Sequence, residues 1–377
     1  MTMRIAEIRT YPLAMPIAPG EHKTSWGEYS SIGIVLVEIR TTDGIVGYGE
    51  ALSRKNPRSS ALLIDELYAP LLVGGDPFLI ERHWQTMFRQ MSGRAGGVAM
   101  EAIAALDIGL WDIMGRALGQ PVHRLLGGMG RERVACYGSA ISWQAEETAA
   151  RQLDQCARQG LKMVKLKLGN PADEAISWAR RVRERVGSGM ALCADANWAY
   201  DVADAAKVAA ALVELDFAWL EEPLIPEDVA GYARLAAKTP LRLAAGESEH
   251  VASVARDIIA SGAIGVFQPD CARAGGITET RRMVALAQAY GVAYAPHVGG
   301  GGAVSAAANL HLAAAMPNFL TYECMIFPSA LRADLTIEPV ADAAALVAGE
   351  IVVPDRPGLG VEINYDTVER LVVKGVS

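Results

Sequence analysis

The sequence predicts an α/β fold whose larger part is a closed barrel of parallel strands. Polar side chains recur every 23 to 28 residues from Lys167 to Glu323, and each follows a short apolar run. This interval matches one strand, one helix and their loops, the repeating unit of a TIM barrel. The runs are apolar throughout, as is typical of strands buried on both faces. The chain of 377 residues also exceeds the roughly 250 that one barrel needs, so we expect a second, smaller domain.

The N-terminal part, residues 1–128, is predicted to be that smaller domain, of α+β type. Its expected strands are 3–12, 32–40 and 44–51. An Asp-Gly turn at Thr41–Gly44 predicts that the last two form a hairpin. Its expected helices are roughly 59–71, 77–91 and 98–117. Two polar loops, 18–31 and 53–59, lie between these elements.

The barrel domain is predicted to span residues 129–340, with eight strands that alternate with helices in a (β/α)7β order. The expected strands lie near 134–140, 163–168, 191–195, 218–221, 241–246, 264–269, 292–297 and 319–323. The clearest helices between them are Glu146–Gln159, Glu174–Val186 and Val202–Glu214. The last segment, 341–377, contains a Pro/Gly-rich stretch and is expected to return to the N-terminal domain.

Composition excludes several classes of partner. The net charge is −8, the sequence pI is near 5.4, and no long Lys/Arg run occurs, so neither nucleic acid nor an anionic membrane is an expected partner. A small anionic substrate fits, because a bound divalent cation can reverse the local field. Five scattered cysteines without a CxxC pair predict reduced thiols in a cytoplasmic protein. We expect neither a signal peptide nor a membrane span.

Three carboxylates, Asp195, Glu221 and Glu247, end successive predicted strands at equal intervals of 26 residues. The carboxyl ends of barrel strands open onto one face, which holds the active site in barrel enzymes. Like charges brought together there repel, so a cation must lie among them. Hard oxygen ligands with places left for water or substrate suit Mg²⁺. The alternative is three separate strand caps or salt bridges, but the equal spacing favours one Mg²⁺ per subunit.

Two further pairs predict acid–base chemistry at the same face. Lys165 and Lys167 alternate on one strand, so both side chains are expected to point into the barrel. A nearby metal ion and second ammonium should lower the pKa of a lysine and make it a usable base. Asp270 and His297 end two later strands, and an aspartate that bonds the imidazole fixes its tautomer and raises its basicity. The alternatives are a solvent-facing lysine pair and a structural histidine.

Two more polar residues are expected beside these groups. Glu323 ends the last barrel strand. It could donate a hydrogen bond to a substrate carboxylate if its neighbours keep it protonated, or it could act as an acceptor. Asn197 lies two residues after Asp195 and could orient a substrate oxygen.

In these motifs the chain resembles the mandelate racemase subgroup of the enolase superfamily over nearly its whole length. The motifs that carry the resemblance are VKLKLG, DANW, EEP, GES, FQPD followed by ARAGG, PHVGGGG and YEC. Residues 103–128 resemble the link between the family's capping domain and barrel. The resemblance implies a modified TIM barrel with an α+β capping domain, to which the C-terminal segment also belongs.

The resemblance also implies a role for each motif. Mg²⁺ binds Asp195, Glu221 and Glu247 and stabilises the enediolate that forms when the proton α to a carboxylate is removed. Lys167 is implied as the base on one face of the substrate, with Lys165 tuning it. His297, paired with Asp270, serves the opposite face. Glu323 is implied to hydrogen-bond the substrate carboxylate.

The loops of the N-terminal domain are expected to select the substrate. Their candidate binding residues are His22, Lys23, Trp26, Tyr29 and Arg54. A polar set of this kind suits a hydroxylated, in some cases doubly acidic, substrate better than an aryl one. We therefore favour dehydration of an acid sugar, an aldonate or aldarate, to a 2-keto-3-deoxy acid.

Alternative functions share either the abstraction of the α-proton or the barrel fold. Racemisation or epimerisation of a 2-hydroxy acid and lactone cycloisomerisation begin with the same proton abstraction. A Schiff-base aldolase is a more distant alternative, because it too uses a strand-end lysine. A non-catalytic metal-dependent binding protein ranks last, since every expected catalytic residue type is present. Barrels of this kind often associate, so we expect a homo-oligomer.

Overall fold

The smaller domain is built on a three-stranded antiparallel sheet. The computed structural model describes residues 3–90 and 96–373. The strands are β1 (Ile5–Pro16), β4 (Ser31–Thr41) and β5 (Val46–Arg54), in the order β1-β4-β5. All three predicted strands and the hairpin turn are confirmed, although β1 runs on to Pro16. In the loop between β1 and β4 a small hairpin pairs β2 (Lys23–Thr24) with β3 (Gly27–Glu28).

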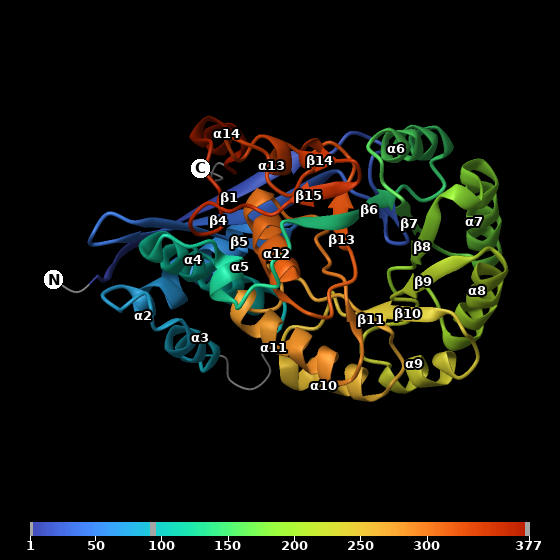
Figure 1. The fold of residues 1–377 in the computed structure, drawn as a ribbon, viewed down its shortest axis with the longest axis horizontal. Coiled ribbons are helices and arrows are strands. Elements are labelled where there is room, and N and C mark those ends of the chain that lie inside the picture. Colours follow the sequence, from blue (N-terminus) through green and yellow to red (C-terminus); the bar gives the residue numbers. More distant parts are fainter. Residues whose placement is uncertain (1–2, 91–95, 374–377) are drawn as a thin grey trace.

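Helices cover one face of this sheet (Figure 1). They are α1 (Pro57–Leu63), a π-helical turn (Ile64–Tyr68), α2 (Ala69–Leu72), α3 (Ile80–Phe88) and α4 (Val98–Leu118). The first three form the helix predicted at 59–71. Helix α3 is shorter than the predicted 77–91, and residue 91 lies outside the described residues. Gly49 of β5 lets α4 pack closely, because a Cβ there would lie 1.7 Å from the carbonyl oxygen of Ala105.

The larger domain is the predicted (β/α)7β barrel. Its parallel strands are β6 (Arg133–Ile141), β7 (Met163–Lys167), β8 (Ala191–Asp195), β9 (Phe217–Glu221), β10 (Arg242–Ala245), β11 (Val266–Phe267), β12 (Ala293–Tyr294) and β13 (Tyr322–Met325). They follow one another in chain order, β13 pairs with β6, and a bridge between Tyr294 and Phe319 closes the ring. The fold class predicted from the sequence is confirmed.

Helices between consecutive strands surround the barrel (Figure 1). They are α6 (Glu146–Arg158), α7 (Ala172–Val186), α8 (Val202–Glu214), α9 (Val229–Ala236), α10 (Ala252–Ala260), α11 (Gly276–Ala289) and α12 (Ala303–Ala315). Two short helices precede and follow the barrel strands in the sequence: α5 (Val122–Leu125) comes before β6, and α13 (Ala330–Ala333) comes after β13. Helix α12 is buried along its whole length, because it lies between the barrel and the smaller domain.

The C-terminal segment contacts both domains in turn. Strands β14 (Leu346–Val347) and β15 (Glu350–Val352) first extend the barrel sheet, because β15 pairs antiparallel with β6. Helix α14 (Tyr365–Leu371) then lies beside β1 of the smaller domain, where Val372 forms a bridge with Leu13. The segment therefore reaches the smaller domain, as predicted, only after it has paired with the barrel.

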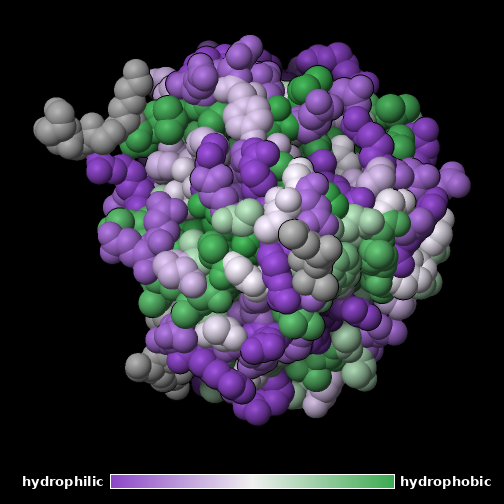
Figure 2. All heavy atoms as spheres, turned by 90° about the vertical axis from the view of Figure 1, so that its left-hand side faces the viewer, coloured by the Kyte–Doolittle hydropathy of each residue, from purple (hydrophilic) through white to green (hydrophobic). Residues whose placement is uncertain are grey.

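The outer surface of the smaller domain mixes polar and apolar side chains. Figure 2 shows hydrophobic residues scattered among hydrophilic ones on this side of the molecule. Exposed apolar residues of this domain include Leu62, Val73 and Leu79. No helix in the described residues is long and apolar enough to cross a membrane.

Two buried carboxylates of the smaller domain cap helices of the barrel. Glu50 of β5 accepts hydrogen bonds from the backbone N–H groups of Gly302 (2.5 Å), Val304 (3.2 Å) and Ser305 (3.2 Å), at the N-terminus of α12. Asp107 of α4 accepts one from Thr278, near the N-terminus of α11. Such N-terminal amides have no partner inside their own helix, and the helix dipole favours an anion there. These contacts fix the two helices that follow β11 and β12.

Replacing Glu50 with alanine should destabilise the protein by about 1–2 kcal/mol or more, because three buried N–H groups lose their acceptor. We expect a lower urea midpoint in unfolding followed by circular dichroism. Glu66→Ala, at an exposed position in the same domain, is the matched control and should leave the midpoint nearly unchanged. Equal midpoints for the two variants would contradict this role of Glu50.

Candidate active site

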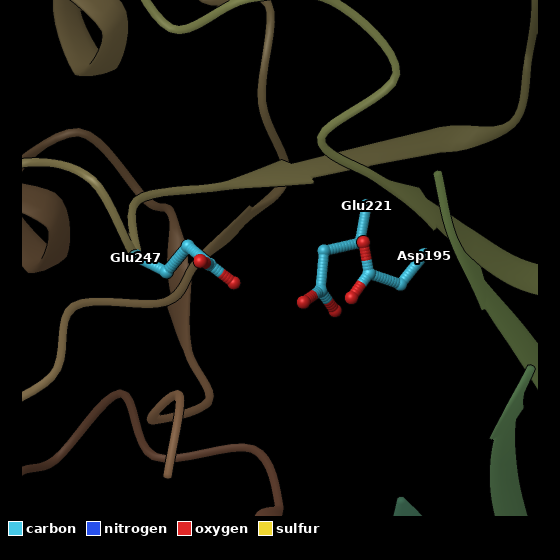
Figure 3. Close-up of side chains that lie close together, drawn as sticks. All are labelled: Asp195, Glu221 and Glu247. Carbon is cyan, nitrogen blue, oxygen red and sulfur yellow. The ribbon is translucent and has the colours of Figure 1, made fainter. Parts of the chain in front are cut away.

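The register of the barrel strands places a row of charged side chains side by side. Lys167 of β7 is aligned with Asp195 of β8, and Asp195 is aligned with Glu221 of β9. Each of the three is the last residue of its strand. Glu247 follows β10, the strand beside β9, by two residues and points toward the other two carboxylates (Figure 3). The predicted convergence of strand-end groups is therefore present in the fold.

The three carboxylates fit a hard divalent cation. All three are buried, and one oxygen from each lies within 4.8 Å of the others. Two oxygens bound on opposite sides of Mg²⁺, each about 2.1 Å from it, are about 4.2 Å apart. Small rotations of the three carboxylate side chains would therefore bring their oxygens to bonding distance from one ion. Burial and the neighbouring carboxylates raise the pKa of Glu221 to about 7, although Lys165 opposes this. The cluster needs positive charge, and a cation between the carboxylates would supply it.

Lys165 lies behind the carboxylates and contacts several of them. It is fully buried, and its Nζ lies 2.6 Å from Glu221 Oε1, 2.8 Å from Glu323 Oε1 and 3.8 Å from Asp195 Oδ2. Burial opposes its charge, but these carboxylates together raise the pKa of Lys165 well above its ordinary value. Lys165 therefore orients candidate metal ligands and lies outside the cavity that a substrate would enter.

Lys167 lines that cavity and contacts Asp195 directly. Burial again opposes the charge, and the attraction of Asp195 raises the pKa of Lys167. The sequence predicts a lowered pKa for a lysine beside a bound metal ion and a second ammonium. Among the side chains alone, the carboxylates outweigh the neighbouring ammonium, and a lowered pKa in the metal-bound site stays a prediction. A cation on Asp195 would compete with Lys167 for the same oxygen and weaken that attraction.

His297 and Asp270 form the predicted pair. His297 Nδ1 lies 2.9 Å from Asp270 Oδ2, and the other oxygen of Asp270 accepts hydrogen bonds from Asn309 and from the backbone of Ala272. His297 Nε2 lies 3.2 Å from Glu247 Oε2, and the ring lines the cavity. Burial opposes protonation, but Glu247 and Asp270 raise the pKa of His297. The pair presents an oriented, basic imidazole to the cavity.

Glu323 acts as an acceptor in this structure. Its two oxygens accept hydrogen bonds from Ser139 Oγ (2.7 Å) and the backbone N–H of Val298 (2.6 Å), and Lys165 lies 2.8 Å away. Burial opposes ionisation, but Lys165 and His297 lower the pKa of Glu323 below its usual range. Of the two roles expected for Glu323, the protonated donor does not agree with this environment.

The smaller domain closes the cavity from the opposite side. Its lining residues, from both domains, include His22, Trp26, Tyr29, Arg54, Lys167, Asn197, Glu247, His297 and Glu323. Burial and the charge of Lys167 lower the pKa of His22 to about 3, so its ring is neutral. Trp26 Nε1 donates a 2.9 Å hydrogen bond to the backbone carbonyl of Asn197, which ties the loop to the barrel. Lys23 lies in β2 and is the one predicted binding residue that does not line the cavity.

Two polar residues beside the carboxylates were not predicted. Arg273 donates to Glu247 Oε1 at 3.1 Å, and Gln268 donates to Glu221 Oε2 at 2.8 Å. Gln268 lies two residues before Asp270, so strand alternation could have indicated that both share a face. Arg273 follows the strand in a loop, where periodicity gives no such signal.

Comparison with known protein families agrees with this geometry. Residues 5–127 match the N-terminal domain of the mandelate racemase / muconate lactonizing enzyme family. Residues 148–367, more than half of the chain, match the enolase C-terminal domain-like family. The chain belongs to the mandelate racemase subgroup of the enolase superfamily.

Relatives in this subgroup carry out different reactions. The chain is 32% identical to a D-galactarolactone cycloisomerase of Agrobacterium fabrum, over 97% of this chain and 98% of the relative. It is 34% identical to a D-galactonate dehydratase of Xanthomonas campestris, over 89% of this chain and 90% of the relative. A crystal structure of a racemase from Streptomyces coelicolor with bound magnesium is 28% identical, with a TM-score of 0.87 over 98% of this chain and 100% of that one.

The subgroup binds Mg²⁺, and the acidic triad predicts how this member does so. Adding Mg²⁺ should raise the melting temperature, because a ligand that binds the native state stabilises it, and calorimetry should give one site per chain. Glu221→Gln removes one anionic ligand while Lys165 keeps Glu323 as a partner. We expect this variant to bind Mg²⁺ at least about tenfold more weakly, since the ion prefers charged oxygen ligands.

The matched control is Glu214→Gln, at an exposed position on α8. It should bind Mg²⁺ as the wild type does. Wild-type affinity in Glu221→Gln would contradict the assignment of that ligand.

Proposed function

We propose that the protein is a Mg²⁺-dependent dehydratase of acid sugars that converts an aldonate or aldarate to a 2-keto-3-deoxy acid. The observation that carries this proposal is that Lys167 and an aspartate-held histidine line one cavity together with Glu247 of the acidic triad. Lys167 also contacts Asp195, a second member of the triad. That set supplies a base and an acid beside a binding place for a carboxylate. The near-complete overlap with sugar-acid enzymes supports the choice of substrate class.

The residues divide the reaction between them. Lys167 would take the proton from the carbon α to the substrate carboxylate. Bound Mg²⁺ would supply a Lewis acid that stabilises the negative charge then formed. His297 would give a proton to the β-hydroxyl as its C–O bond breaks, so that water leaves and the enol product rearranges to the 2-keto acid. Asp270 holds the imidazole for this transfer, and Lys165 and Glu323 keep the surrounding charges in place.

The position of the two groups supports separate roles. Lys167 ends β7 and His297 follows β12, and the strands β6 and β13 lie between β7 and β12 on the shorter path round the barrel. A substrate held between them can lose a proton on one side and receive one on the other. The same placement suits epimerisation, which differs only in where the second proton is delivered.

A cycloisomerase is the second candidate, because the relative from Agrobacterium fabrum matches the chain almost end to end. Lactone opening starts with the same proton abstraction, and the ring oxygen then leaves in place of a hydroxyl. The acid next to the leaving oxygen would again be His297.

Two variants test the acid–base assignment. Lys167→Ala and His297→Asn should each lower kcat by about 10²–10⁴-fold, the range that a general acid or base contributes. Lys207→Ala, on the exposed face of α8, is the control and should retain activity. If His297→Asn still exchanges the α-proton but no longer eliminates water, His297 acts in the elimination and not in the proton abstraction. Unchanged turnover in Lys167→Ala would reject Lys167 as the base.

A library screen tests the reaction itself. With Mg²⁺, at least one aldonate or aldarate should yield a 2-keto product that semicarbazide detects, and EDTA should abolish the signal. If no member is dehydrated but one exchanges its α-proton in D₂O, the enzyme is an epimerase or racemase. If only a lactone is consumed, with a 2-keto acid as product, it is a cycloisomerase. Trapping of a keto acid by borohydride would indicate the Schiff-base aldolase.

We also propose that the protein is a cytoplasmic homo-oligomer that uses a small carboxylate substrate. All five cysteines are buried and free, which suits a reducing compartment. Exposed apolar residues such as Leu62 and Leu79 offer surface for association.

A further inference from the structure

The end of β5 is shaped to direct one arginine into the active-site cavity. Along the β4–β5 pair, Ile34 is aligned with Leu52 but Gly33 is aligned with Arg54, so Ser53 is an extra residue. Such a β-bulge bends a strand and redirects the side chain that follows it. Arg54 has φ of 49°, a left-handed conformation that is strained for a residue with a Cβ.

The neighbouring strand accommodates this conformation. A Cβ at Gly33 would lie 2.9 Å from the carbonyl oxygen of Arg54 and 2.8 Å from the ring of Pro57, so only glycine fits there. Strained backbone of this kind persists where the surrounding structure enforces it, and it concentrates at functional sites. The bulge, the positive φ and the glycine together hold the Arg54 side chain toward the cavity.

In the cavity, Arg54 has no carboxylate of its own. Its Nη2 lies 3.2 Å from Glu247 Oε1, its one ion-pair partner in the part of the chain that the structure describes. The same oxygen accepts from Arg273 Nη1 at 3.1 Å, and Glu247 Oε2 lies 3.2 Å from His297 Nε2. Glu247 is also a candidate metal ligand. One carboxylate is therefore shared by three cationic or basic groups and a metal site.

The two arginines differ in a way that separates their roles. The Arg273 side chain is 10% exposed and has a second acidic neighbour, Glu101, at 3.8 Å. The Arg54 side chain is 31% exposed and lines the cavity beside His22 and Tyr29. Arg273 can stay with Glu247 when the metal binds, whereas Arg54 then needs another anion, because a partly desolvated guanidinium without one is unfavourable.

We infer that Arg54 binds a second carboxylate of the substrate, distinct from the one that binds at the triad, and that the substrate is a dicarboxylic acid sugar. This inference rests on the proposed function and selects one class within it. The reacting carboxylate belongs with the triad in the barrel, while Arg54 reaches the cavity from the smaller domain. A guanidinium recognises a carboxylate through two parallel hydrogen bonds, a geometry that a hydroxymethyl group cannot match.

The test uses aldonate and aldarate pairs with identical configuration at C2 to C5, so that only C6 differs. The wild type should favour the aldarate of at least one pair by about 10- to 100-fold in kcat/KM, the effect of one charge-assisted contact. Arg54→Gln should remove this preference by slowing the aldarate while the aldonate changes little, and Arg54→Lys should keep part of it. Lys55→Gln, at the adjacent exposed position, makes the same change in net charge and should keep the full preference.

Two results would overturn the inference and leave dehydration standing: a wild-type preference for the aldonate in every pair, or an equal loss on both members in Arg54→Gln. The wild-type ratio of kcat/KM for aldarate and aldonate tests the inference even if Arg54→Gln does not fold. A binding measurement tests the role of Arg54 independently of the proposed function. In the presence of Mg²⁺, adipate should bind more tightly than hexanoate to the wild type but not to Arg54→Gln. If no acid sugar reacts, the proposed function fails, and a failure of adipate to discriminate then rejects the role of Arg54 as well.

Discussion

The confinement of several carboxylates in one buried place is the physical constraint on which the site depends. Asp195, Glu221 and Glu247 lie together at the mouth of the barrel. Glu323 lies 2.8 Å from Lys165, which also contacts Glu221. Such a cluster is stable only if cations are interleaved with it. Lys165 and Arg273 supply fixed positive charge from behind, and a divalent ion completes the compensation. The charges that hold the metal ligands are therefore also those that set the acid–base behaviour of the site.

The smaller domain contributes both rigidity and recognition. Glu50 and Asp107 accept the free N–H groups at the starts of α12 and α11, the helices that follow His297 and Asp270. This arrangement couples the position of the Asp270–His297 pair to the docking of the two domains. Arg54 and the loop that carries His22 enter the cavity from the same domain. The barrel thus provides the candidate acid–base and metal-binding groups, and the smaller domain adds further groups to the same cavity.

Much of this arrangement could be predicted from the sequence because a parallel barrel repeats with a regular period. Apolar runs gave all eight strands, and the residue at the end of each run gave the acidic triad and the positions of Lys167 and His297. Questions that needed an electrostatic balance stayed open. The sequence did not decide whether Glu323 donates or accepts hydrogen bonds; in the structure Lys165 and His297 lower its pKa, and it accepts from Ser139 and from the backbone of Val298. The direction of a pKa shift depends on every charge within a few ångström, and spacing along the chain does not count these charges.

The sequence by itself determined the fold class, the order of the strands and the set of polar residues at one face, because each depends on periodicity over about 25 residues. Only the tertiary structure decided which partners those residues have. Glu50 meets Gly302 across 252 positions of sequence, and Arg54 meets Glu247 across 193. It also showed that Lys23 lies outside the cavity whereas Arg54, redirected by a bulge, lies within it. Contacts between domains follow from how two surfaces pack, and no local pattern in the chain encodes that packing.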